Sequence, residues 1–285
     1  MQTFRTVNEL RAAVQGRSPL LQVGFVPTMG YLHGGHLALI ARARAACDLV
    51  VVSIFVNPTQ FGPREDLGSY PRDEARDLGL LEGAGVDWAF LPDAAEIYPP
   101  GYATYVEVRG STAGLEGAAR PGHFIGVATV VAKLFNLVQP HRAYFGQKDA
   151  QQAVVIRRMV RDLNFPIEII VVPTVREPDG LALSSRNIYL DPDERKAALV
   201  LSKALVAAYA AWKAGVRDGD WLRAEMNRVV AAEPFAHADY VSIADPDTLA
   251  ELTEIGPQQG ALASLAVRIG RGTRLIDNLL LNPTH

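Results

Sequence analysis

The sequence predicts an α/β protein with a Rossmann-like parallel sheet in its N-terminal part and a smaller α+β domain after it. Short continuous apolar runs alternate with helical patterns as far as residue 172, and such runs are typical of strands that helices cover on both faces. A turn-rich segment at 174–180 then precedes an alanine-rich helical region. Since 285 residues leave room for two domains, we expect domains at 1–175 and 176–285. The second would act as a lid.

The elements of the first domain follow from these patterns. Apolar residues at helical spacing predict crossover helices over 126–138 and 150–163, and Leu10 with Val14 predicts a short amphipathic helix near the N-terminus. The predicted strands are 21–26, 49–56, 86–91, 142–145 and 167–172.

The second domain should begin with a helix at Asp191 and Pro192, because a capping carboxylate followed by proline is a typical helix start. We expect one long alanine-rich helix that ends near Gly215 and a second helix over 219–232. Strands are predicted over 240–243 and 262–269.

Composition excludes several classes of function. The net charge of −3 argues against a nucleic-acid partner, because such proteins usually carry a basic excess. The apolar run at 49–56 is far shorter than the roughly 20 residues that span a bilayer, and the N-terminus lacks the pattern of a signal peptide. A single cysteine, Cys47, fits a reducing compartment. We therefore expect a cytoplasmic protein that binds no membrane.

The run from Pro27 to His36, PTMGYLHGGH, joins a predicted strand to a predicted helix. Its glycines let a phosphate approach the backbone, the free amides of the first helical turn point at the anion, and His33 and His36 can donate to its oxygens. The pattern predicts a phosphate site. The alternative is that the histidines only cap the turn. A zinc pair is disfavoured, because helical histidine ligands usually lie at i and i+4 with a third ligand nearby.

Two further segments carry phosphate-binding groups. Lys148 and Asp149 follow the predicted strand 142–145, and ligands of open α/β sheets bind at the carboxyl ends of strands. Lys148 can pair with phosphate, and Asp149 can orient it or cap the next helix. The Ser184–Arg186 loop adds two hydroxyls and a guanidinium near the domain junction. Each segment alone could be structural, but their joint occurrence favours a nucleotide site.

Long blocks of sequence resemble the pantothenate synthetase family of the nucleotidylyltransferase superfamily, which has an HxGH motif. The blocks are PTMGYLHGGH (27–36), FVNPTQFGPREDLGSYPRD (55–73), GAARPGHFIGVATVVAKLFNLVQP (117–140), YFGQKDAQQ (144–152), LSSRNIYL (183–190) and RIGRGTRLIDN (268–278). The resemblance implies ATP-dependent condensation of pantoate with β-alanine through pantoyl adenylate, with release of AMP and pyrophosphate. It covers nearly the whole chain.

The resemblance also implies residue roles by position. Catalytic roles fall to His33, His36, Lys148 and Arg186, which with the serines would neutralise phosphate charge. ATP binding falls to Met29, Gly30, Tyr31, Leu32, His33, Gly34, Gly35, His36, Gly146, Gln147, Lys148, Asp149, Val175, Leu183, Ser184, Ser185 and Arg186, with Val175 against the adenine. By the same resemblance, Gln60 and Gln152 would bind pantoate, and Gln60 would also lie near the β-alanine site. Neutral glutamines suit this role because they can bind pantoate without a positive charge that would lower the nucleophilicity of its carboxylate.

Four residues are further candidates for shaping the pocket or its lid, each with a purely structural alternative: Asn57, Tyr70, Arg120 and His123. The family resemblance implies Mg²⁺ on the ATP phosphates, with its protein ligands left open, and a homodimer.

The sequence departs from the usual form of the family at Gly34, Gln147, Leu183 and His141. None of these departures removes a proposed catalytic group. Gln147 stands where Glu is usual, which deletes a negative charge beside Lys148.

Two rivals remain. A nucleotidylyltransferase would release pyrophosphate and keep the nucleotide in its product, whereas a nucleotide-sensing module would bind ATP without turnover. An aminoacyl-tRNA synthetase is disfavoured because no basic RNA-binding appendage is visible.

Overall fold

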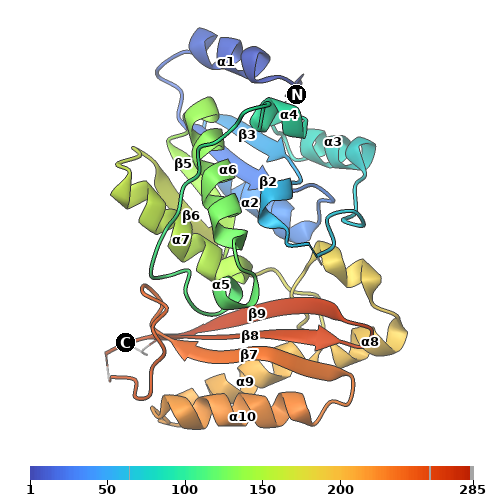
Figure 1. Ribbon diagram of the computed structural model, residues 1–285, viewed down its shortest axis with the longest axis vertical. Coiled ribbons are helices and arrows are strands. Elements are labelled where there is room, and N and C mark those ends of the chain that lie inside the picture. The colour runs from blue at the N-terminus through green and yellow to red at the C-terminus, as the bar shows by residue number, and fades with distance from the viewer. Residues whose placement is uncertain (64, 257, 283–285) are drawn as a thin grey trace.

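The computed structural model describes residues 1–63, 65–256 and 258–282, which form two sheets with helices packed on them (Figure 1). The first sheet has six parallel strands in the order β1-β4-β3-β2-β5-β6. The strands are β1 (Gln2–Phe4), β2 (Val23–Thr28), β3 (Leu49–Ile54), β4 (Trp88–Phe90), β5 (Arg142–Gly146) and β6 (Glu168–Val172).

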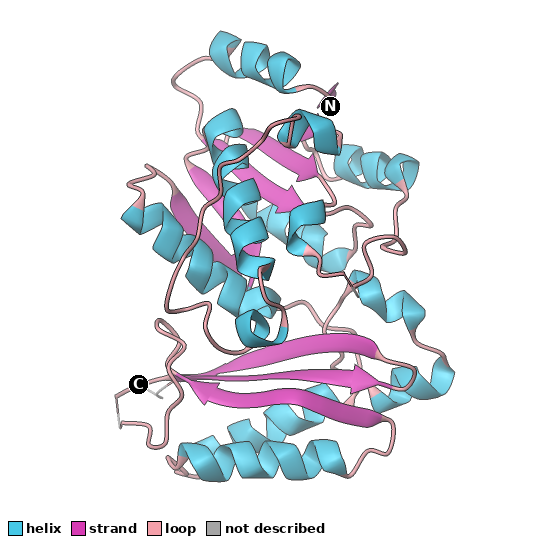
Figure 2. Ribbon diagram, viewed as in Figure 1, coloured by secondary structure: helices cyan, strands magenta, loops and turns pink. Residues whose placement is uncertain are grey.

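Helices cover both faces of this sheet (Figure 2). Side chains alternate along β3, so that Val51 packs in a core with α1, α6 and α7, whereas Val50 and Val52 pack in another with α2 and α3. The side chains of the continuous apolar runs are therefore buried in two hydrophobic cores, one on each face of the sheet, as expected for parallel strands. These helices are α1 (Val7–Gly16), α2 (Gly34–Arg44), α3 (Glu74–Gly83), α6 (His123–Val138) and α7 (Ala150–Asp162), and the short helices are α4 (Ala94–Ile97) and α5 (Glu116–Ala119).

The strand order reverses at β2, which pairs with β3 on one side and β5 on the other. In open α/β sheets a ligand site forms outside the carboxyl ends of the strands at such a reversal. Here the ends of β2 and β5 lead into the histidine turn and into the 3-10 turn η2 (Gln147–Asp149). The topology therefore brings the first two predicted phosphate-binding segments together.

The second sheet is antiparallel, in the order β7-β8-β9, and lies below the first sheet in Figure 1, with α9 and α10 on its far side. Its strand β9 contacts η2 and the 3-10 turn η3 (Ser185–Tyr189). The elements are η3 (Ser185–Tyr189), α8 (Pro192–Ala197), α9 (Val200–Lys213), α10 (Gly219–Ala231), β7 (Ala236–Ala244), β8 (Ala261–Ile269) and β9 (Thr273–Leu281).

The predicted fold class is confirmed, and β2 to β6 lie within two residues of their predicted bounds. The strands β1 and β9 and the helix α3 were not predicted. The single long helix after Asp191 is wrong: the start at Asp191 is present with a full capping box, but the helix ends at Ala197. The chain turns at Ala198, which is fully buried, so that α9 can pack on β8 and β9. The domain division at residue 175 stays a prediction.

In the described part of the chain, no helix combines the length and the apolar character needed to cross a bilayer.

Candidate active site

The turn after β2 is fixed by a buried carboxylate from α3. Gly30 and Tyr31 have positive φ angles of 80° and 49°, and this conformation costs a non-glycine residue about 1–2 kcal/mol. Asp77 is 1% exposed and accepts hydrogen bonds from the backbone N–H groups of Tyr31 and Leu32, at 2.6 and 2.7 Å. Asp77 thus stabilises the strained turn that leads from β2 into α2.

His33 and His36 then form a reciprocal cap at the start of α2. The Nδ1 of His33 accepts from the N–H of Gly35 at 3.1 Å, and the Nδ1 of His36 accepts from the N–H of His33 at 3.3 Å. A ring nitrogen that accepts carries no proton, so each neutral imidazole has its proton on Nε2. Capping therefore explains part of the motif and still leaves two Nε2–H donors for an anion.

Both imidazoles are neutral at pH 7. Burial and, to a smaller extent, the charge of Lys148 lower the pKa of His33 to about 4. Burial, His33 and Lys148 lower the pKa of His36 to about 3. The two histidines are therefore neutral at pH 7, and each can donate one hydrogen bond from Nε2 to an anion.

The Ser184–Arg186 loop lies against the histidine turn. The hydroxyl of Ser185 donates to the carbonyl of Tyr31 at 3.3 Å. Arg186 is held by Asp66, which accepts from Nε at 2.9 Å and from Nη2 at 2.8 Å. This two-point contact fixes the guanidinium plane and raises the pKa of Arg186 despite its burial.

A cavity of about 230 Å³ joins the three segments. Its wall includes most of the predicted ATP-binding residues: Met29, His33, Gly35, His36, Gly146, Lys148, Asp149, Val175, Leu183, Ser184, Ser185 and Arg186. Asp149 lines the cavity, and its side chain makes no capping hydrogen bond to α7.

Five predicted ATP-binding residues do not line the cavity of the described structure. Gly30 and Tyr31 form the turn itself, and Leu32 is fully buried in the core. Gly34 lies beside Leu183. The side chain of Gln147 turns to the second sheet, where it donates to Asn278. A direct ATP contact remains a prediction for these positions.

Gln60 and Gln152 line the same cavity, and neighbours orient the amide of Gln60. Asn57 donates to its Oε1 at 3.0 Å, and the NH₂ group of Gln60 donates to the sulfur of Met29 at 3.2 Å. His123 donates from Nδ1 to the backbone carbonyl of Gln60 at 2.9 Å. One N–H of this NH₂ group remains for a ligand in the cavity, and Asn57 and His123, which hold Gln60, line the same cavity.

Tyr70 and Arg120 also line this cavity. Both Arg120 and Gln152 in addition line a larger cleft of about 960 Å³ between the two sheets.

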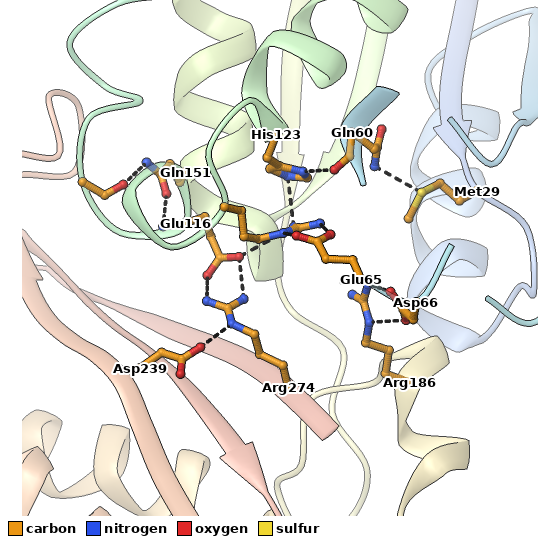
Figure 3. Close-up of polar contacts among 12 residues, drawn as sticks. Met29, Gln60, Glu65, Asp66, Glu116, His123, Gln151, Arg186, Asp239 and Arg274 are labelled. Atoms are coloured by element: carbon orange, nitrogen blue, oxygen red, sulfur yellow. Dashed lines mark hydrogen bonds and ion pairs between the residues drawn. The ribbon is translucent and has the colours of Figure 1, made fainter. Parts of the chain in front are cut away.

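A chain of alternating charges crosses this cleft from the second sheet to the N-terminal part (Figure 3). Arg274 donates to both oxygens of the buried Glu116 at 2.7 Å and to Asp239 at 2.6 Å. Glu116 lies 3.7 Å from Arg120, which binds Glu65. The network links β7 and β9 to the cavity wall. Sequence analysis missed Glu116 and Arg274, because nothing in their local pattern shows that two residues so far apart meet.

The described residues contain no group of three or more His, Cys, Asp or Glu side chains placed to hold a metal ion together. Asp149 is the carboxylate on the wall of the smaller cavity.

The fold and the site define the class of protein. A parallel sheet that reverses its order at β2, with an HxGH turn, a lysine turn and an SSR loop around one cavity, is the arrangement predicted for a protein of the nucleotidylyltransferase type.

Comparisons with known proteins specify the family. The family model for pantoate-beta-alanine ligase matches residues 2–280. A pantothenate synthetase from Chloroflexus aggregans is 62% identical over 99% of this chain and 100% of its own, and one from Roseiflexus castenholzii is 63% identical over 99% of each. The chain therefore belongs to the pantoate–β-alanine ligase family and is an enzyme.

Solved structures agree. The crystal structure of pantothenate synthetase from Thermus thermophilus has a TM-score of 0.93 and 54% identity, over 99% of this chain and 100% of that chain. A pantoate-beta-alanine ligase from Francisella tularensis, complexed with beta-gamma ATP and beta-alanine, has a TM-score of 0.82 and 34% identity over 98% and 97% of the chains.

Proposed function

We propose that this enzyme condenses pantoate with β-alanine at the expense of ATP, through pantoyl adenylate. Family membership supports the reaction. The observation that carries it to this site is the shared cavity, where the phosphate-binding turns meet two neutral glutamines.

In the first step a carboxylate oxygen of pantoate attacks the α-phosphorus of ATP. A new O–P bond forms, the bond from the α-phosphorus to the bridging oxygen breaks, and pyrophosphate leaves. The Nε2–H groups of His33 and His36, together with Lys148 and Arg186, would stabilise the charge that develops on phosphate oxygens. The roles differ: the histidines donate as neutral groups, whereas Lys148 and Arg186 bring positive charge.

In the second step the amine of β-alanine attacks the acyl carbon of pantoyl adenylate. The C–N bond forms, the bond from carbon to the AMP oxygen breaks, and the amine loses a proton. No protein nucleophile is needed, so this step depends on positioning and on exclusion of water. Gln60 is suited to hold pantoate, because Asn57 directs its NH₂ group into the cavity.

Mg²⁺ is proposed to accompany ATP. Mg²⁺ is usually held by substrate phosphates and one or two carboxylates rather than by a protein cage, which fits a cavity wall that carries Asp149 and no clustered metal ligands among the described residues. When bound, the ion would neutralise part of the phosphate charge. Chelation with EDTA should abolish AMP formation, and excess Mg²⁺ should restore it.

We further propose a cytoplasmic homodimer that uses no nucleic acid. Light scattering coupled to size-exclusion chromatography would give the mass of a dimer, and a monomeric mass would refute this assignment.

The test of the reaction follows AMP with pantoate, β-alanine and ATP, omitting each in turn. AMP should require both organic substrates. Pyrophosphate without AMP would favour the nucleotidylyltransferase, and ATP binding without turnover would favour the sensor. His36→Ala should lose most adenylation while its circular dichroism spectrum stays native, and an unfolded variant would support a purely structural role.

A further inference from the structure

Asn278 on β9 lies against the turn that carries Lys148. It is 4% exposed, and its NH₂ group donates to the carbonyl of Gln147 at 2.9 Å and to the carbonyl of Lys148 at 2.8 Å. Its Oδ1 accepts from the side chain of Gln147 at 2.9 Å. One side chain of the second sheet therefore satisfies three polar groups of η2.

These contacts act on the part of η2 that determines where Lys148 points. η2 is three residues long and begins directly at the end of β5, so its own hydrogen bonds give it little rigidity. Two backbone carbonyls and one side chain are held from outside by a buried amide. The geometry restrains both peptide planes next to the Cα of Lys148, without a contact to the ammonium itself.

The preceding residue, Asp277, fastens a second loop. It is 2% exposed, and Arg176 donates to its two oxygens at 2.6 and 2.9 Å. Arg176 also donates to the carbonyl of Gly180, so Asp277 holds the segment that leads into the Ser184–Arg186 loop. Neighbouring residues of β9 thus contact the η2 turn that carries Lys148 and the segment that leads to Arg186.

We infer that Asn278 is a positioning residue: its amide clamps η2 from the second sheet and thereby sets the place of Lys148 in the ATP cavity. The inference rests on the proposed function, because it concerns the phosphate step. The phosphate site is then complete only when the second sheet is packed against η2.

Two substitutions test this contact. Asn278→Asp keeps the shape and the acceptor for Gln147 but replaces the two donors with an oxygen that faces two carbonyls. Asn278→Ala removes all three contacts. A displacement on the order of 1 Å at a catalytic group can cost about 100-fold, so we expect Asn278→Asp and Asn278→Ala to lower kcat/KM for ATP by about 10- to 100-fold.

The decisive measurement is a double-mutant cycle of Asn278→Ala and Lys148→Ala, in which AMP formation by the full-length enzyme gives kcat/KM. If Asn278 acts through Lys148, adding Asn278→Ala to Lys148→Ala should reduce kcat/KM by less than about threefold further, because residues that act as a unit are not additive. A full multiplicative loss would overturn the inference. Asn227→Asp is the matched control: it removes an exposed amide that donates to the carbonyl of Arg223 and makes the same change of charge.

A readout apart from activity guards against misfolding. Circular dichroism melting of each variant reports the fold, and mass spectrometry reports the rate at which Lys148 reacts with an amine-modifying reagent, with and without ATP. ATP should protect Lys148 strongly in the wild-type enzyme and weakly in Asn278→Ala. Equal protection in a folded variant would refute the positioning role. If instead the wild-type enzyme formed no AMP, the proposed function would fail, whatever Asn278 does.

Discussion

Asp77 offers the sharpest test of how the histidine turn is built. Its carboxylate lies on α3, outside the cavity, and accepts the N–H groups of Tyr31 and Leu32 at 2.6 and 2.7 Å. Asp77→Asn keeps the size of the side chain but leaves a single acceptor oxygen. One of the two N–H groups must then face an NH₂ group, so the turn loses a hydrogen bond and the negative charge that strengthened the other.

The expected magnitude follows from these contacts. A hydrogen bond to a charged group contributes about 1.5–3 kcal/mol, against about 1 kcal/mol for a neutral one. Asp77→Asn should therefore lower the free energy of unfolding by about 2–3 kcal/mol. If the turn relaxes, His33 moves with it, and kcat/KM for ATP should fall by about tenfold or more.

Urea unfolding measures the first quantity and steady-state AMP formation the second. Asp87→Asn is the control, because Asp87 also accepts a backbone N–H, from Val50 at 2.7 Å, and lines neither the ATP cavity nor the larger cleft. We expect it to lower stability without changing the KM for ATP. If Asp77→Asn matched the wild-type enzyme in both measurements, the turn would hold without the carboxylate, and the account of its strain would be wrong.

Three further predictions concern His36, Arg274 and Gln152. The pKa of His36 is about 3 in the folded protein and about 6.5 in the unfolded chain, so the unfolded chain binds the proton first as the pH falls below 6.5. The free energy of unfolding should then fall by up to about 1.4 kcal/mol per pH unit. His36→Gln should reduce this slope in urea titrations between pH 7 and 5. Arg274→Met leaves the buried Glu116 without its main partner and should cost about 3 kcal/mol of stability by thermal unfolding, and an unchanged melting temperature would show that the ion pair contributes nothing. Gln152→Ala should raise the KM for pantoate by about tenfold with the KM for ATP nearly constant, and an equal rise in both would refute its assignment to pantoate.

Periodicity sufficed for five of the six strands of the parallel sheet, because buried parallel strands have continuous apolar sequences such as 49–56. It missed the short edge strand β1. It failed for β9, where Asp277 and Asn278 interrupt the apolar pattern to make contacts with distant loops. It failed also at Ala198, where a good helix former occupies a turn. Tertiary packing overrides local propensity at both places.

Likewise, only some residues of the site could be found from the sequence. The glycines and histidines after β2 could be found from the sequence, since the motif itself creates the anion site. Asp77, Glu116 and Asn278 could not, because each acts by holding another residue and its partner is far away in the chain. Conversely, Gln147 was assigned to ATP by position, but its side chain contacts Asn278.

The substrate dependence of AMP formation tests the central claim most directly. With purified enzyme, ATP and Mg²⁺, AMP should appear in step with pantothenate only when pantoate and β-alanine are both present. AMP formed at the same rate without either acid or amine would contradict the proposed condensation.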